Sequence, residues 1–227
     1  TGDADVCWLA GEPTESLDSN VLAGWYYYFR DEQLHLDAMT NRYDPYAGRE
    51  VAAPPFFRGD EAGSVTAHVV QTRAKLRERM AQRRAKEPEV DFQLFGVPMI
   101  PCLRMTRRLA APFALGEHHV HQPFEDAIGL TGDWRKAGPV YAIPYRALIA
   151  PVNRNLLAAG RCISADRTAW DVTRAIPGCA VTGEAAGTAA ALAVRQNGGD
   201  ATNLPVEIVR KRLAAQGVLL DPELVRA

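Results

Sequence analysis

The segment Ile176 to Gly199, IPGCAVTGEAAGTAAALAVRQNGG, constrains the fold of this chain more than any other. Its alanines favour a helix, Pro177 suits a first helical turn, and Asn197-Gly198 is a typical helix end. Glycines and alanines leave one side of this helix nearly flat. A neighbouring backbone can therefore pack closely against it.

A predicted strand precedes this helix. Residues Asn155 to Gly160, NLLAAG, are typical of a buried strand that ends in glycine. Ligands of α/β proteins bind at the carboxyl edge of the sheet, and a first helical turn offers free N–H groups and a positive dipole end. Gly178 has no Cβ, so a ring or phosphate can come close. The spacing alone favours another interpretation, a tightly packed core helix without a ligand.

Other elements follow from local patterns. The aromatic run at residues 24–36 fits a strand or a buried helix. An amphipathic helix is expected at 64–86, short strands within 94–115, and a strand at 140–145. A last helix is expected from Pro205 to Gln216, before Gly217.

The first residues, TGDADVCWLAG, predict a short helix from Asp3 to Gly11 with an acidic start and a glycine stop. A helix of this kind normally follows a strand, and neither a strand nor an initiator methionine precedes it here. We therefore expect that the chain is truncated on its N-terminal side.

Composition narrows the function classes. The 26 basic and 27 acidic residues give a net charge of −1, which provides no electrostatic reason to expect nucleic acid or a membrane surface as a partner. The four cysteines form no CxxC pair, and no apolar run reaches the ~20 residues that span a bilayer. We expect a soluble cytoplasmic protein with reduced thiols and a small-molecule substrate. A homo-oligomer stays open.

Several motifs together carry a family resemblance. The stretch from Ile143 to Ala193, with NLLAAGRCIS and the helix above, closely resembles the C-terminal signature of FAD-dependent oxidoreductases related to glutathione-reductase-type flavoproteins. TGD at the N-terminus is similar to that family's ATGD segment. PMIPCLRMTRRL and DAIGLTGDWRKAGPVYAIPYRAL are similar to its middle region.

The resemblance implies FAD as cofactor and assigns roles to individual positions. The N-terminal TGD would approach the pyrophosphate or ribose, and the turn after the predicted strand would pass the ribityl chain. The helix N-terminus would lie under the pyrimidine edge of the flavin. The implied cofactor residues are Thr1, Gly2, Asp3, Gly160, Arg161, Cys162, Ser164, Pro177, Gly178, Cys179 and Ala180.

Two departures from the family pattern matter. Arg161 stands where related flavoproteins have an aspartate after the glycine, so backbone N–H groups or Ser164 would replace that contact. The GxGxxG fingerprint does not occur in these 227 residues. We therefore expect a C-terminal part of the enzyme that needs a missing N-terminal FAD-binding segment, and that alone does not retain FAD and is inactive.

Other polar residues are weaker candidates. Glu117, His118, His119 and His121 could ligate a metal only in a tight loop, and we expect none there, although His119 could act on a substrate as acid or base. Arg104, Arg108 and Arg174 could hold a substrate carboxylate, with surface ion pairing as the alternative for the last two. No catalytic residue can be assigned.

The sequence thus predicts an α+β fold: an incomplete FAD-binding α/β domain formed by both chain ends (residues 1–15 and 141–227) with an inserted mixed α+β substrate-side domain (16–140). The predicted function is oxidation or reduction of a small organic substrate by hydride transfer with flavin. The alternatives are a non-catalytic binding or regulatory module on a flavoprotein scaffold, and an unrelated protein whose alanine-rich helix imitates the signature. The unrelated protein would keep Asn155–Gly160 and Pro177–Gln196 apart.

Overall fold

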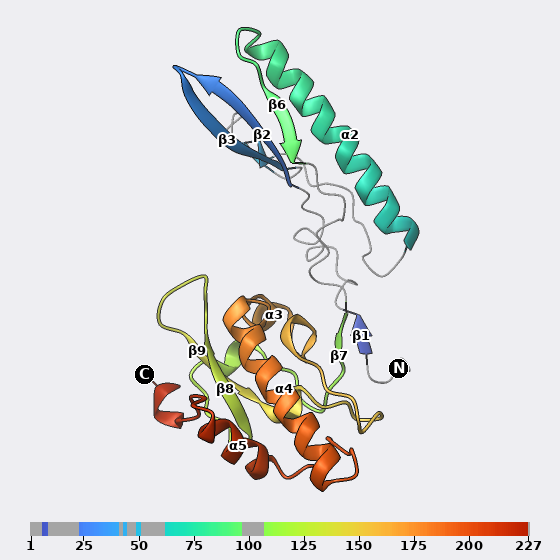
Figure 1. Ribbon diagram of the computed structural model, residues 1–227, viewed down its shortest axis with the longest axis vertical. Helices are drawn as coiled ribbons and strands as arrows, with labels where there is room; N and C mark the ends of the chain where they lie inside the picture. Colours follow the sequence, from blue (N-terminus) through green and yellow to red (C-terminus); the bar gives the residue numbers. More distant parts are fainter. Residues whose placement is uncertain are drawn as a thin grey trace. The chain divides into compact units, whose positions relative to one another are not determined.

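The computed structural model describes residues 6–8, 23–40, 43–44, 49–50, 62–96 and 107–226. The chain forms two compact units: unit 1 combines Thr1–Leu9 with Arg107–Ala227, and unit 2 is Ala10–Thr106. Helices and strands occur in both, so the fold is α+β (Figure 1). The domain boundaries predicted at residues 15 and 140 stay a prediction.

Unit 2 is a small antiparallel sheet covered by a long helix (Figure 1). Strand β2 (Ala23–Arg30) pairs with β3 (Gln33–Thr40) and with β6 (Gln93–Gly96). Helix α2 (Ala62–Lys86) confirms the predicted amphipathic helix. The aromatic run, for which strand and helix were both open, forms the β2–β3 hairpin. The core of this unit consists of Tyr28, Leu76, Met80 and Phe92. The short strands β4 (Tyr43–Asp44) and β5 (Arg49–Glu50) pair with each other.

The β2–β3 hairpin turns through two residues in the left-handed region, Asp31 (φ 49°) and Glu32 (φ 62°). A two-residue turn of this kind favours Asn-Gly. Replacing Asp31-Glu32 by Asn-Gly should therefore raise the free energy of unfolding of unit 2 by about 1 kcal/mol. Urea denaturation followed by fluorescence measures it. Glu32→Ala keeps the Cβ and serves as the control, and an unchanged midpoint in the Asn-Gly variant would contradict the turn assignment.

Unit 1 is built on a hairpin that two helices cover (Figure 1). Strand β8 (Ala127–Gly132) pairs with β9 (Val140–Pro144), and helices α4 (Ile176–Gln196) and α5 (Val206–Ala215) pack on β8. Three buried alanines spaced four residues apart in α4, Ala185, Ala189 and Ala193, face the core. Their short side chains let the helix approach the core closely.

Shorter elements complete unit 1. Strand β1 (Val6–Trp8) pairs with β7 (Arg107–Leu109), and helix α3 (Arg167–Thr173) precedes α4. The described residues of this unit also form the single 3₁₀ turns η2 (Glu117–His119), η3 (Tyr145–Ala147), η4 (Gly160–Cys162) and η5 (Pro222–Leu224). In the described residues, no helix is both long and apolar enough to cross a membrane.

The predicted ends of α4 and α5 are confirmed. Helix α4 has Pro177 in its first turn and Asn197 at its C-cap, and Gly198 follows with φ 58°. Helix α5 ends before Gly217, whose φ is 89°. Both glycines occupy the left-handed conformation that stops a helix at little cost.

Two predicted elements are wrong. The segment expected to be a helix from Asp3 to Gly11 contains strand β1, because Val6–Trp8 pairs with β7 and tertiary pairing overrides a weak local preference. Asn155–Gly160 is not a strand. Ala150 N donates to Leu156 O at 3.2 Å and Ala158 N donates to Leu148 O at 2.8 Å, so the segment folds back on the residues just before it. It keeps one bridge, Leu157 to Ile149.

Candidate functional site

The η4 turn lies directly against the start of α4. Gly160 N donates a hydrogen bond of 2.8 Å to Thr182 Oγ1. Gly160 has φ 69°, and a Cβ added to it would lie 3.3 Å from Cys179 Sγ. The two segments that the family resemblance joins are therefore neighbours in space, although the first is a loop. This contact contradicts the alternative of an unrelated protein that keeps the two segments apart.

Thr182 fastens the turn to the helix. Its side chain is fully buried, and its hydroxyl donates to Gly178 O at 2.8 Å while it accepts from Gly160 N. The hydroxyl thus uses its donor and one acceptor position inside the protein. The sequence does not single out Thr182, since a threonine inside an alanine-rich helix has no distinctive spacing.

The first two turns of α4 present backbone groups beside the short side chains of Pro177 and Ala180 and the large side chain of Ile176. Its N-cap, Ala175, makes no side-chain capping hydrogen bond. Pro177 and Ala180 are exposed, and Ile176 is 86% exposed. The N-terminal N–H groups of a 21-residue helix carry partial positive charge, which attracts an electron-rich group. Nothing bulky on Pro177 or Ala180 hinders a flat ring edge, so these residues fit the predicted cofactor.

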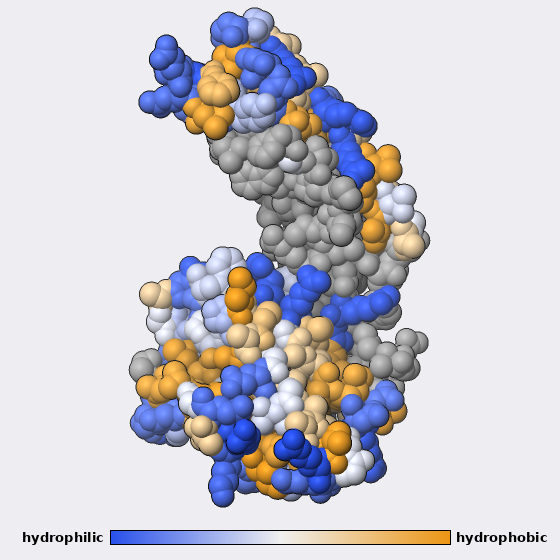
Figure 2. Space-filling view, in the orientation of Figure 1, coloured by the Kyte–Doolittle hydropathy of each residue, from blue (hydrophilic) through white to orange (hydrophobic). Residues whose placement is uncertain are grey.

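Further along α4, the exposed side of the helix also carries short side chains. Between its first and last turns it consists mainly of alanine and glycine, and Figure 2 shows pale atoms along the helix there. A Cβ added to Gly183 or Gly187 would meet nothing within 4 Å. The helix therefore buries one alanine row and exposes another row of small residues.

Gly178 has a different environment from the one expected. It is buried, and an added Cβ would lie 3.2 Å from Thr173 O and 3.4 Å from Thr131 Oγ1. The missing side chain thus makes room for the end of α3 and for β8. Its predicted contribution to cofactor binding stays a prediction, confined to its backbone.

The two cysteines near the turn are free thiols. Cys179 is partly buried, and its Sγ lies 3.5 Å from Arg174 O. Cys162 is exposed, with its Sγ 3.4 Å from Ala159 O. Cys162 belongs to the η4 turn, and Cys179 belongs to α4. Their contacts with the cofactor stay a prediction. Arg161, the middle residue of the η4 turn, is exposed.

Arg108, a predicted substrate residue, contacts Ser164, a predicted cofactor residue, behind the η4 turn. Arg108 Nη1 donates to Ser164 Oγ and to Leu109 O, each at 3.2 Å. Ser164 is fully buried, and the backbone around it is fixed, since Ser164 N donates to Ala147 O at 2.9 Å. Arg108 Nε is buried and makes no hydrogen bond to the described residues. The guanidinium therefore holds the hydroxyl of Ser164 through Nη1.

His119 is held in an aromatic cluster. Gly116 N donates to its Nδ1 at 2.8 Å, which leaves the proton of the neutral ring on Nε2. Its ring lies 4.8 Å from that of Phe113 and 5.6 Å from that of Phe124. Burial, and next the nearby His118, lower the pKa of His119 below its ordinary value of 6.5.

The lowered pKa of His119 predicts a pH dependence. Below pH 6.5 the unfolded chain takes up a proton at this histidine before the folded chain does, so acid should reduce stability. His119→Gln removes that proton uptake. The variant should lose less free energy of unfolding than the wild type between pH 7.5 and 5.5, measured by urea denaturation. Equal losses in both proteins would show that His119 titrates normally.

Arg174 is engaged within unit 1. Its Nε donates to Asp171 Oδ1 at 2.6 Å. Its guanidinium lies over the rings of Trp134 and Trp170, with centroid distances of 5.2 and 5.1 Å. The ion pair that was one of two interpretations is present. A contact between Arg174 and substrate stays a prediction.

The remaining predicted residues are outside these contacts. Thr1, Gly2, Asp3 and Arg104 lie outside the described residues. Glu117, His118 and His121 flank the aromatic cluster. No group of three or more metal-ligating side chains occurs in the part of the chain that the structure describes.

Comparison with known proteins identifies one family. A family model described as FAD dependent oxidoreductase matches residues 12–213. The matched range contains the η4 turn and all of α4, and it ends within α5. No curated protein and no solved structure matches the chain.

Proposed function

Since the chain belongs to the family of FAD dependent oxidoreductases, we propose that it forms the flavin-ring side of an enzyme that oxidises or reduces a small organic substrate. Its motifs favour the branch related to glutathione-reductase-type flavoproteins. The observation that carries the proposal is the hydrogen bond from Gly160 N to Thr182 Oγ1, which joins the two signature segments at the start of α4.

The proposal gives each part of the site a task. Bound FAD would supply the acceptance or donation of a hydride, which side chains cannot perform. The first turn of α4 would stabilise negative charge at the ring edge through its N–H groups. Pro177, Cys179 and Ala180 would bound the ring, and Gly160–Cys162 would line the chain that carries it. Ser164, which is buried, would support that turn from behind. These 227 residues have no GxGxxG fingerprint, so we assign them only this side of the cofactor.

The substrate would meet polar groups behind and beside the turn. Among the predicted arginines, Arg108 is the one whose described contact reaches a proposed cofactor residue, because its Nη1 donates to Ser164 Oγ. His119 has a fixed tautomer and a lowered pKa, so it would serve near neutral pH as a neutral group that can donate from Nε2. Both roles depend on the proposed cofactor position.

Flavin content tests the proposed function. The complete natural gene product that carries these residues should purify with a flavin absorption spectrum, and an oxidisable substrate should bleach it in the absence of oxygen. A colourless protein that FAD does not reconstitute would favour a non-catalytic module on the same scaffold.

A further inference from the structure

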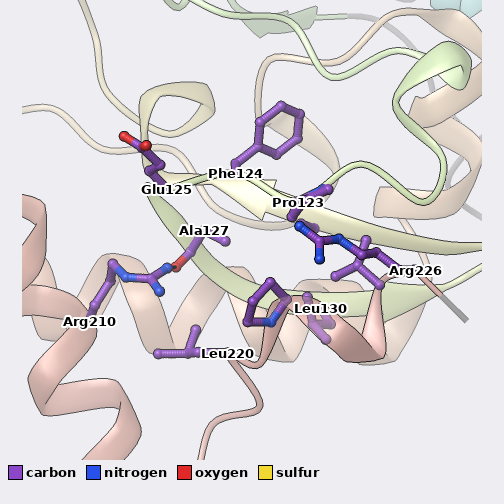
Figure 3. Close-up of a pocket in the computed structure, with 11 residues that line it drawn as sticks. Pro123, Phe124, Glu125, Ala127, Leu130, Arg210, Leu220 and Arg226 are labelled. Carbon is purple, nitrogen blue, oxygen red and sulfur yellow. Dashed lines mark hydrogen bonds between the residues drawn. The ribbon is translucent and has the colours of Figure 1, made fainter.

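Unit 1 has a cavity whose lining includes no residue of the η4 turn or of α4. It measures about 260 Å³ and lies among β8, β9, α5, the 123–125 loop and the segment that follows residue 219 (Figure 3). Its apolar walls include Phe124, Ala127, Leu130, Ala142, Leu220 and Val225. The volume is close to the lower end of the roughly 300–1,000 Å³ that small-molecule sites occupy, so it suits a compact ligand.

Two guanidinium groups line this cavity from different elements. Arg210 comes from α5, and its Nη1 is hydrogen-bonded to Ala127 O. Arg226 comes from the residues after η5, and its Nη1 donates to Glu223 Oε1 at 2.6 Å. Each bond uses one of five N–H groups. In Figure 3 the carboxylate of Glu125 points away from Leu130 and Leu220. Glu223 balances the charge of Arg226, whereas Arg210 bonds only a backbone carbonyl among the described residues, so the positive charge that the cavity offers a ligand comes mainly from Arg210.

We propose that this cavity binds a small amphipathic carboxylate. The apolar walls would hold an aromatic or branched body of roughly ten non-hydrogen atoms, and Arg210 and Arg226 would hold the carboxylate. A neutral molecule of the same shape would lose the charge-assisted bonds, and a cation would be repelled. The site is additional to the proposed flavin site and does not depend on it.

The wall of the cavity connects it with His119. The ring of Phe124 lines the cavity and also lies 5.6 Å from the ring of His119, in edge-to-face contact. His121 Nδ1 lies 2.7 Å from Val225 O, which fixes another wall residue to the loop that carries both histidines. A ligand packed against Phe124 therefore changes the surroundings of His119, so the NMR signals of the His119 ring report binding.

The test uses three probes of one shape: phenylacetate, 2-phenylethanol and phenethylamine. Calorimetric titration at low salt should show phenylacetate binding about tenfold or more tightly than the alcohol, and the amine binding least, because bonds to charged groups contribute about 1.5–3 kcal/mol. The NMR signals of the His119 ring should shift when phenylacetate binds. Neither readout requires a flavin.

Matched variants locate the charge. Arg226→Met should weaken phenylacetate binding about tenfold and leave the alcohol unchanged, and Arg210→Met should do the same if circular dichroism shows it folded. Arg212→Met, on the same helix but outside the cavity, should keep wild-type affinity. The proposal is overturned if phenylacetate binds no better than the alcohol, if no probe binds, or if Arg212→Met and Arg226→Met lose equally.

Discussion

Thr182→Val is expected to reduce the free energy of unfolding of unit 1 by about 1–3 kcal/mol. Valine has nearly the same shape, so the change removes the hydroxyl and little else. Gly160 N, which is partly buried, and Gly178 O, which is buried, would each lose a hydrogen bond of 2.8 Å. Without that bond the η4 turn is no longer fixed on α4, so the complete gene product should also lose flavin. Urea denaturation and the flavin-to-protein absorbance ratio measure both effects.

Thr182→Ser is the matched control, because serine keeps the hydroxyl and deletes a methyl group. It should retain the flavin ratio of the wild type and most of the stability. If the valine variant kept both properties, the hydroxyl would not be what holds the turn. Equal flavin loss in both variants would point to the methyl group instead.

Gly178→Val is expected to destabilise unit 1 by about 1–3 kcal/mol or more. Its Cβ would be 3.2 Å from Thr173 O and 3.5 Å from Thr173 Cα, so the backbone at the end of α3 would have to move. Stability is lost because the packing of α4 against α3 is disrupted, so the effect does not require a bound ligand. The unfolding midpoint of the chain without flavin should fall clearly.

Gly183→Ala provides the comparison on the same helix. A Cβ there meets nothing within 4 Å, and alanine is the better helix former, so stability should rise by up to about 1 kcal/mol. A Gly178→Val variant as stable as the wild type would contradict the observed packing of α4 against α3.

The sequence predicts those elements that local chemistry defines. Gly198 and Gly217 follow the ends of helices α4 and α5 and have positive φ angles, which glycine adopts most easily. The sequence therefore predicts both helix ends. The segment Asn155–Gly160 shows the opposite case. Two leucines and two alanines fit a strand equally well. Only the hydrogen bonds that Leu156 O accepts from Ala150 N and that Ala158 N donates to Leu148 O show that the segment folds back as a loop.

Residue roles were harder to predict than positions. The glycine at 178 and the one at 160 look alike in the sequence, yet one packs against Thr173 and the other adopts φ 69° beside Cys179. Arg108 and Ser164 are 56 residues apart, and no local pattern indicates that they meet. The ion pair of Arg174 with Asp171, in contrast, lies within one helical turn and was among the expected alternatives.

The claim that the start of α4 borders the flavin ring is tested most directly by adding bulk there. Ala180 and Ala190 are both exposed alanines on this helix, one in its second turn and one in its second half. In the complete gene product, Ala180→Trp should lower FAD affinity at least about tenfold in a flavin-fluorescence titration, while Ala190→Trp stays at the wild-type value. An Ala180→Trp variant that binds FAD as tightly as the wild type would contradict the account.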